Sequence, residues 1–324
     1  MPSGTRHCSY GVCRAVNWVT VWGFGADIRT AGDTLFVREK GKSTADRYPL
    51  NEVSHLIIAG DNILHTSVIE KCQEKKIPVS FFDIRGNPAG CLFGENPRLS
   101  AAQDAVSAHA YAKSVIESSL GARMRYLHEL AEQHGEFYRK GEVEILMQAR
   151  SELEYLITLP ELARVYTLTK DMYYEILSRA VPRETGYKRR TEDVFADPVN
   201  TLLSIGYAAL YATVNAACRG AGLDTKKSGF FKKYVPCKGD PCVCEIMEPA
   251  LVPMVDRVVI QMAEDGLLSD ATRSGKRWIF PEKTRAVFSA RLRESVDCFC
   301  IEENVKAYAK AVEAGKAPEF HYPA

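Results

Sequence analysis

The sequence predicts an α+β fold, in which a small N-terminal β-rich domain (residues 1–98) is followed by a larger all-α domain (residues 99–324). In the first domain, short runs of Val, Ile, Leu and aromatic residues are separated by Gly, Asp and Pro, a pattern typical of strands and turns. From Leu99 onward, Gly and Pro become scarce, and Ala, Leu, Glu, Arg and Met recur at helical spacing. The length of 324 residues is also that of roughly two domains.

Strands outnumber helices in the predicted first domain. Apolar runs bounded by turn residues predict strands within residues 16–28, 33–41, 47–60 and 77–84. Apolar residues at helical spacing predict one short helix over residues 65–76, with Thr66 or Ser67 as its N-cap. A turn at residues 85–90 then ends the last of these strands.

Helical spacing dominates the second domain. The pattern predicts amphipathic helices over residues 110–134 and 143–159, after a domain boundary within residues 95–102. Apolar residues from Leu202 to Val214 predict a core helix, with Asp197 as its N-cap and Pro198 in its first turn. Helical spacing returns in the C-terminal part of the chain, over residues 257–268 and 286–315, with a break at 270–285.

Two features after the core helix point to chemistry. Glu245 and Glu248 stand three residues apart, which places both carboxylates on one face if the segment is helical. Before them, phenylalanines at 230 and 231 are flanked by Lys226, Lys227, Lys232 and Lys233. Basic residues interleaved with aromatic residues suit contacts with phosphates and bases, although a solvated loop has the same composition. The combination predicts nucleic-acid chemistry.

The composition indicates the class of protein and its compartment, but it does not identify a ligand. Apolar residues make up 46% and charged residues 26% of the chain, and the net charge is +1, so any nucleic-acid surface must be local. No run of about 18 uninterrupted apolar residues predicts a membrane span. The N-terminus lacks the succession of a secretion signal, and we expect an intracellular, cytoplasmic protein.

The ten cysteines are too dilute for a disulfide scaffold. Five of them offer thiolates to a zinc ion, but their spacing does not match the usual C-x2-C pairs: Cys237, Cys242, Cys244, Cys298 and Cys300. The alternative is that they are small buried apolar side chains, and the sequence favours this one.

Several motifs in order resemble the CRISPR-associated spacer-acquisition integrase, the endonuclease of the CRISPR adaptation module. In the first domain, the similar segments are residues 48–60 and 65–90. In the second, they are residues 148–153, 188–211 and 220–224, and E-x-M-E-P at 245–249 with Asp256 eight residues after Glu248. The resemblance covers roughly residues 20–260 and implies a β-domain followed by a helical domain.

The resemblance also implies metal-dependent strand transfer on DNA. A divalent ion, Mg²⁺ or Mn²⁺, is held by hard oxygen ligands and activates a 3'-hydroxyl for attack on a repeat boundary. The family's acidic pair falls on Glu245 and Glu248. The family's early Glu falls on Tyr166, and its His falls on Lys232 or Tyr234, so the expected ligand set is incomplete. Glu161 is the nearest acid to the early position.

The resemblance further implies a homodimer joined through its β-domains, short double-stranded or forked DNA as ligand, and a small ferredoxin-like adaptation partner. Besides the four lysines, the segment Lys188, Arg189 and Arg190 is a second candidate for gripping DNA phosphates, or else a solvated linker. The sequence leaves three functions open: a DNA-binding integrase with impaired or remodelled catalysis, an inactive scaffold or interaction subunit, and an endonuclease with a rebuilt site of Glu161, Glu245 and Glu248.

Overall fold

The computed structural model describes residues 17–75, 77–84, 88–92, 97–135 and 137–322. The chain forms two compact units: the first ends at Leu92, and the second, which also takes Gly86–Pro88, continues from Phe93 to Ala324. Among the described residues, the first unit contains every strand except those of one hairpin, and the second is mostly helical, so the predicted α+β class is confirmed. The predicted boundary between residues 98 and 99 lies inside helix α2 (Pro97–Ala105). The predicted turn at 85–90 and segment 95–102 lie partly outside the described residues.

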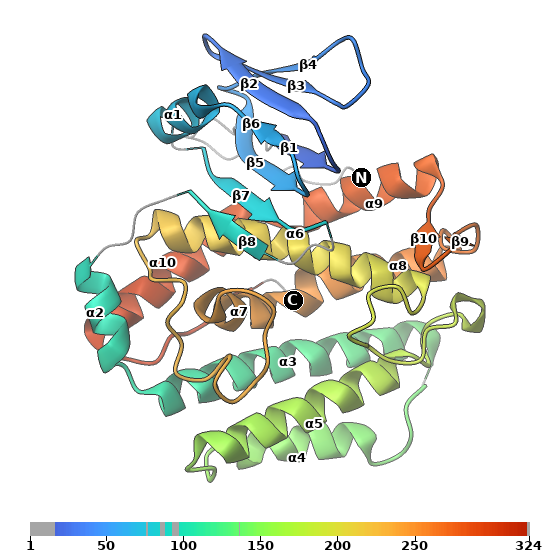
Figure 1. Ribbon diagram of the computed structural model, residues 1–324. Coiled ribbons are helices and arrows are strands. Elements are labelled where there is room, and N and C mark those ends of the chain that lie inside the picture. The colour runs from blue at the N-terminus through green and yellow to red at the C-terminus, as the bar shows by residue number, and fades with distance from the viewer. Residues whose placement is uncertain (1–16, 76, 85–87, 93–96, 136, 323–324) are drawn as a thin grey trace, which may run out of the picture. The chain divides into compact units, whose positions relative to one another are not determined.

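The first unit holds two four-stranded sheets and one helix, α1 (Thr66–Glu74) (Figure 1). One sheet has the order β1 (Asn17–Trp22), β5 (Val53–Ala59), β7 (Val79–Phe82) and β8 (Pro88–Cys91). The other has the order β4 (Asp46–Pro49), β3 (Thr34–Arg38), β2 (Asp27–Ala31) and β6 (Ile63–Leu64). The parallel register sets Val19 beside Leu56 and Leu56 beside Val79, and all three are buried. This row of side chains forms part of the core of the unit.

The segment 16–28, within which strands are predicted, contains β1 and the start of β2. The chain turns at Gly23, whose carbonyl oxygen lies close to Gly60. Gly60 has a φ of +90°, and a Cβ there would stand 2.1 Å from that oxygen. Only glycine fits such an approach, so the two glycines set the point at which the first strand ends.

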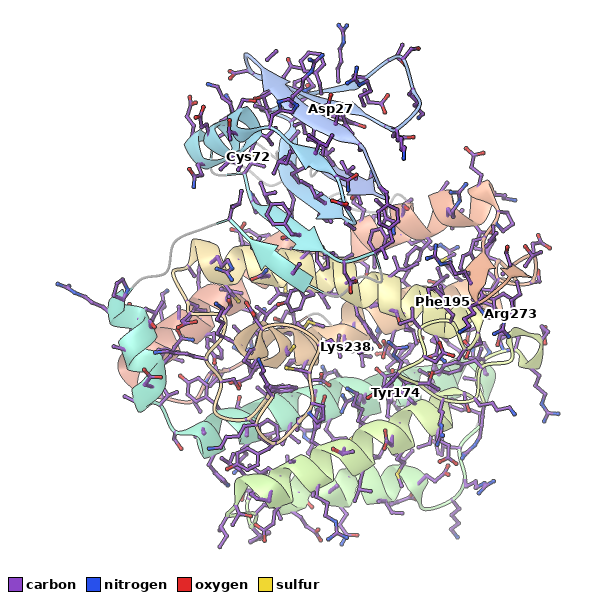
Figure 2. All side chains as sticks on the ribbon, in the orientation of Figure 1. Asp27, Cys72, Tyr174, Phe195, Lys238 and Arg273 are labelled. Carbon is purple, nitrogen blue, oxygen red and sulfur yellow. The ribbon has the colours of Figure 1, made fainter. Side chains whose placement is uncertain are left out.

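The second unit consists of two groups of helices. Helix α3 (Ala108–His134) lies against both α4 (Glu142–Glu152) and α5 (Leu159–Leu177), as Figure 1 shows. Helix α6 (Pro198–Gly220) packs against α7 (Pro241–Met247), α8 (Arg257–Glu264) and α10 (Cys298–Ala314). Figure 2 shows side chains filling the space between these helices, with Tyr174 labelled on α5. The second unit also contains a 3-10 turn at Arg183–Thr185, a hairpin of β9 (Thr272–Ser274) and β10 (Arg277–Ile279), and α9 (Glu282–Ser295).

Two predicted helical segments are interrupted in the structure. The helix predicted over residues 143–159 ends at Glu152, and α5 begins at Leu159 behind a capping box of Thr158 and Glu161. The segment predicted over residues 286–315 divides between α9 and α10, where the side chain of Asp297 accepts from two backbone N–H groups. In both cases a capping residue starts the next helix, a signal that apolar spacing alone does not carry.

Helix α6 is the core helix of the second unit. Asp197 accepts a hydrogen bond from the backbone N–H of Asn200 at 2.7 Å and caps the helix as the sequence predicts. The helix is long and apolar enough to cross a membrane, yet 67% of its most apolar window is buried inside the protein. Burial to this extent is typical of a helix that packs among other helices and does not face lipid.

Candidate functional site

The candidate site centres on the segment that runs from α7 into α8. Pro249 and Pro253 lack the N–H groups that a regular helix needs. A 3-10 turn at Glu248–Ala250 and a π-helical stretch at Val252–Asp256 therefore follow α7 before α8 begins. Such irregular turns are frequent at functional sites, because they redirect side chains along an otherwise continuous helix. Glu245 lies in the regular part and Glu248 begins the irregular part.

Glu248 forms a buried ion pair with Arg123 of α3. Nη2 of Arg123 donates to Oε1 of Glu248, and the two side chains are only 2% and 5% exposed. The guanidinium carbon lies 5.5 Å from the ring centroid of Tyr166 and 5.8 Å from that of Tyr173. Burial alone would lower the pKa of Arg123, but Glu248 and the tyrosines outweigh it and hold the pKa above its usual value. The charge of Glu248 is therefore neutralised from within the protein.

Tyr166, at the position where the resemblance expects a metal-binding Glu, lies beside this ion pair. Its ring packs edge-to-face against Phe230 and Phe231, with centroids 6.4 and 5.8 Å away. Its hydroxyl accepts a hydrogen bond from Nζ of Lys170 at 3.1 Å. Burial, and next the charge of Glu248, hold the pKa of Tyr166 well above 10.0. The hydroxyl therefore stays protonated and offers no anionic oxygen to a metal ion.

Glu245 faces other partners than Glu248. Its carboxylate accepts hydrogen bonds from the hydroxyl of Ser228 and from that of Tyr308, the latter at 3.0 Å. Burial raises the pKa of Glu245 to about 7, although these two hydrogen bonds act in the opposite direction. The two glutamates predicted to share one face thus bind separate partners, Glu245 on the side of α10 and Glu248 on the side of α3.

Asp256 anchors the far end of the segment. It is completely buried and accepts hydrogen bonds from the hydroxyls of Tyr207 and Tyr173, the latter at 3.0 Å. Tyr174 extends this network through a 2.7 Å hydrogen bond with Tyr207. Burial raises the pKa of Asp256 to about 6, and the tyrosine hydroxyls moderate that shift.

Lys232 and Tyr234, the two positions considered for the family's His, lie in the loop between α6 and α7. Lys232 is exposed, has a φ of 67°, and donates its backbone N–H to the carbonyl of Val235 at 2.7 Å. Nζ of Lys233 lies 5.3 Å from the ring centroid of Tyr234. The loop therefore presents cations where the resemblance expects an imidazole ligand.

The residues present do not fit Mg²⁺ or Mn²⁺. Among the residues that the structure describes, no group of three His, Cys, Asp or Glu side chains is placed to hold a metal ion. Glu161 accepts hydrogen bonds from the backbone N–H of Thr158 at 3.0 Å and from its hydroxyl at 2.8 Å, so it caps α5 and is not brought to Glu245 and Glu248. The structure therefore does not assemble the rebuilt carboxylate site considered from the sequence.

The five cysteines considered for zinc lie in two places. Cys237, Cys242 and Cys244 belong to the loop before α7 and to α7 itself, and Cys298 and Cys300 belong to the first turn of α10. The thiols of Cys237 and Cys244 donate weak hydrogen bonds to the carbonyls of Gly239 and Lys238, both at 3.8 Å. Two of the five, Cys242 and Cys244, are buried, whereas Cys237, Cys298 and Cys300 are partly exposed.

The predicted DNA-binding cations fall into two groups. Two are used inside the protein: Arg190 donates to Oδ1 of Asn200 and to Ser204, each at 2.8 Å, and Lys227 donates to the carbonyl of Ser100 at 2.9 Å. The others are exposed to solvent, namely Lys188, Arg189, Lys226, Lys232 and Lys233. Only this second group has charges available to a large anionic ligand.

Sequence reasoning missed Arg123, the partner of Glu248. The buried face of α3 runs through Ile116, Leu120, Arg123, Leu127 and Leu130. A single arginine at helical spacing within an otherwise apolar stripe is a signal of a buried charge that needs a partner. The stripe predicts that Arg123 needs a counter-charge, but it does not identify Glu248, which lies 125 residues away along the chain.

Comparison with known proteins agrees with the motifs. The family model described as CRISPR associated protein Cas1 matches residues 19–294. The CRISPR-associated endonuclease Cas1 1 of Thermus thermophilus is 30% identical over 285 residues, which cover 84% of this chain and 85% of that protein.

Two solved structures share the fold. A casposase bound to its integration product has a TM-score of 0.78, at 18% identity, over 94% of this chain and 93% of its own. A Cas6-RT-Cas1–Cas2 complex has a TM-score of 0.76, at 18% identity, over 95% of this chain and 36% of the matching chain.

Proposed function

Because the chain belongs to the Cas1 family of CRISPR-associated proteins, we propose that it binds short DNA duplexes for spacer acquisition without metal-dependent strand transfer of its own. The family acts in CRISPR adaptation, and its nuclease chemistry depends on a metal ion. In this proposal the chain retains the family's DNA binding, but its site does not bind the metal ion.

The buried pair of Arg123 and Glu248 carries the proposal. In an active site, the metal ion compensates the negative charge of its carboxylate ligands and polarises the reacting oxygens. Here the guanidinium already compensates Glu248, and it has no empty coordination position to offer a DNA oxygen. Tyr166 and Phe231 fill the space beside the pair, so the site is closed by side chains of the protein.

The exposed cations support DNA binding. Lys226, Lys232 and Lys233 flank one loop, and Lys188 and Arg189 lie before the first turn of α6. The overall charge of +1 supplies no general attraction to DNA, so binding depends on these local groups. Replacing them is expected to weaken binding to all sequences alike, because phosphate contacts carry no sequence information.

Family likeness also supports the proposed partners. One neighbour in fold is a Cas6-RT-Cas1–Cas2 complex, and a small ferredoxin-like partner of that kind is proposed here. The first unit supports the proposed homodimer: β1 is an edge strand of its sheet among the described residues, and Trp22 and Phe24 are 48% and 58% exposed. An apolar edge of this kind is usually covered by another chain.

The test has a binding arm and a catalytic arm. We expect the purified protein to bind labelled forked duplex DNA with a dissociation constant that rises with salt concentration. Lys226→Ala/Lys233→Ala should weaken this binding, and the matched control Lys283→Ala/Lys310→Ala, which removes two exposed lysines of α9 and α10, should not.

In the catalytic arm, the protein is incubated with repeat-containing plasmid, donor DNA and Mn²⁺. We expect no strand-transfer product. Robust Mn²⁺-dependent strand transfer by the wild-type protein would refute the catalytic half of the proposal. Absence of salt-dependent binding to any duplex would refute the other half.

A further inference from the structure

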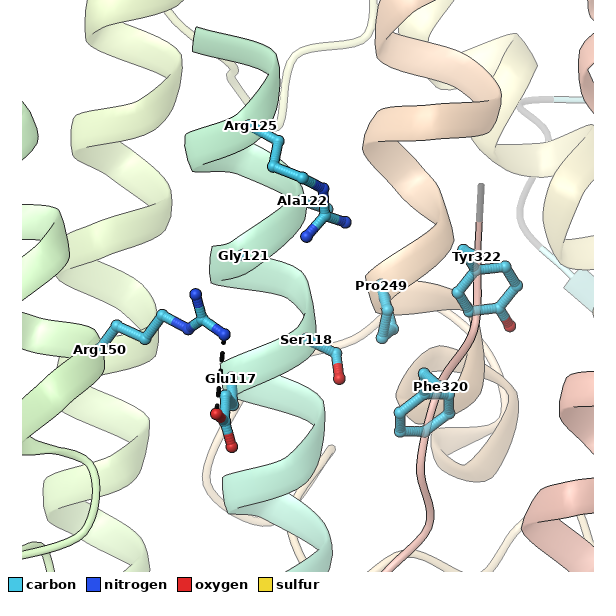
Figure 3. Close-up of a pocket in the computed structure, with 9 residues that line it drawn as sticks. All are labelled: Glu117, Ser118, Gly121, Ala122, Arg125, Arg150, Pro249, Phe320 and Tyr322. Carbon is cyan, nitrogen blue, oxygen red and sulfur yellow. Dashed lines mark ion pairs between the residues drawn. The ribbon is translucent and has the colours of Figure 1, made fainter. Parts of the chain in front are cut away.

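A pocket of about 210 Å³ lies over α3, and its lining includes Pro249 of the candidate segment but none of that segment's three carboxylates (Figure 3). Its floor is Gly121, with Ser118 one turn away. Arg125 reaches it from α3 and Arg150 from α4, while the wall on the other side of α3 is formed by two aromatic residues of the C-terminal segment. Arg123 belongs to the opposite, buried face of the same helix.

Two guanidinium groups converge on the floor of this pocket. A Cβ built on Gly121 would lie 3.4 Å from Nη1 of Arg125 and 3.8 Å from Cζ of Arg150, so both groups approach one point. Arg150 pairs with Glu117 at 3.8 Å, whereas Arg125 has no ion-pair partner in the described part of the chain. Like charges repel at such a distance unless an anion lies between them. The floor thus carries one more positive charge than its own carboxylate neutralises.

The aromatic wall is fixed in place. The rings of Phe320 and Tyr322 are nearly parallel, with an interplanar angle of 12° and centroids 6.3 Å apart. The hydroxyl of Tyr322 donates to the carbonyl of Ile246 at 3.0 Å, and the backbone N–H of His321 donates to Asn304 at 2.8 Å. Because the segment is held at both points, the half-buried rings present a preformed apolar surface beside the arginines.

We propose that this pocket binds a nucleotide of single-stranded DNA, with a phosphate between Arg125 and Arg150 and the base against Phe320 and Tyr322. Paired guanidinium groups match the geometry of phosphate oxygens, and aromatic rings accept any base. A second cavity shares Arg150 and Glu117 with the first and adds one cation, Lys113, and one carboxylate, Glu154. This inference rests on the proposed function, because it assumes that DNA is the ligand of the second unit.

The experiment measures binding of a short 5'-phosphorylated oligothymidylate, labelled at its 3' end, by fluorescence anisotropy. Free thymidine monophosphate and inorganic phosphate serve as competitors. Arg125→Ala/Arg150→Ala is expected to weaken oligonucleotide binding by about tenfold or more. One lost phosphate contact should also make the slope of log K against log salt shallower by about 0.7. The control Arg285→Ala/Arg293→Ala removes two exposed arginines of α9 with the same charge change and should alter neither quantity.

The variant Phe320→Leu tests the proposed contact with the base separately from the contact with the phosphate. It should weaken thymidine monophosphate as a competitor and leave inorganic phosphate unchanged, because only the nucleotide carries a ring to stack. The unfolding temperature of every variant is recorded, so that a folding defect is seen directly. Equal loss of binding in the two double-arginine variants would overturn the pocket, and so would equal competition by a polyglutamate peptide, which would indicate an unspecific anion patch.

The outcomes distinguish this inference from the proposed function. If forked duplex DNA binds and both double-arginine variants hold the oligonucleotide as well as the wild type, the pocket fails and the proposed function stands. If thymidine monophosphate binds through Arg125 and Arg150 in a protein that binds no duplex, the pocket stands and the proposed function fails.

Discussion

Replacing Glu248 by Gln tests whether the negative charge of Glu248 is compensated by Arg123 or by a metal ion. The two side chains are 5% and 2% exposed, and the guanidinium lies between the rings of Tyr166 and Tyr173. Glu248→Gln removes the only carboxylate paired with Arg123 among the described residues and leaves a cation in an apolar cage. Breaking one partner of a buried pair costs about 3–5 kcal/mol, so we expect a loss of that size in the free energy of unfolding.

The double variant Arg123→Met/Glu248→Gln provides the decisive comparison. Removing both charges eliminates the uncompensated cation, and replacement of a buried pair by similar neutral volumes is often near neutral. We therefore expect the double variant to be more stable than Glu248→Gln alone, with a coupling energy of about 2 kcal/mol or more. Glu144→Gln, at an exposed glutamate of α4, is the matched control and should change stability by less than about 0.5 kcal/mol.

Urea denaturation followed by circular dichroism measures these differences, provided that the m-values of the variants agree. The same samples are heated with and without Mn²⁺, since an ion that binds only the folded state raises its unfolding temperature. A cost below about 1 kcal/mol for Glu248→Gln, or a Mn²⁺-dependent stabilisation that this variant abolishes, would refute the assignment of Arg123 as the counter-charge.

Three further predictions concern single side chains. Gly206→Ala should destabilise the protein, because the new Cβ would lie 2.4 Å from Cγ1 of Val255. Gly121→Ala adds a Cβ with no contact below 3.4 Å and should stabilise its helix by about 0.5–1 kcal/mol. Thermal unfolding compares the two variants. Since burial raises the pKa of Glu245 from 4.5 to about 7, the folded state binds the extra proton, and stability should fall as pH rises through this window. Glu245→Gln should flatten that decline by up to about 1.4 kcal/mol per pH unit in urea titrations; an unchanged slope would contradict it. Glu161→Ala removes the capping contacts of α5 and should lower the unfolding temperature without altering the response to Mn²⁺, which a metal ligand would alter.

The fold could be predicted because its signals are local. The change of spacing near Leu99, and the cap formed by Asp197 before α6, can both be recognised within a few residues of sequence. The division between α4 and α5 could have been predicted too, because Thr158 and Glu161 form a capping box with the T-x-x-E pattern. Apolar spacing hid it, since Leu153 and Leu162 on either side of the break are both buried and continue the stripe.

The candidate site could be predicted only in part, because its contacts join distant segments. The resemblance identifies Tyr166 and Glu248 as corresponding positions, and the structure brings them together beside Arg123. Nothing in the local sequence indicates that Arg123 rather than Lys232 neutralises Glu248. A lysine in an exposed loop and an arginine in an apolar stripe differ in burial, and burial depends on the packed helices.

The three buried carboxylates of the α7 to α8 segment each have a partner or a pKa shift within the protein that offsets the cost of burying a charge. Glu248 is neutralised by Arg123, and a pKa of about 7 favours the protonated form of Glu245. Asp256 accepts stabilising hydrogen bonds from the hydroxyls of two tyrosines. Each acid thus has its own compensation, and a divalent ion would have to displace Arg123 before it reached Glu248. Restoring a glutamate at Tyr166 alone would therefore place a second carboxylate beside an existing cation. A working metal site requires the removal of Arg123 as well as the return of the missing ligands.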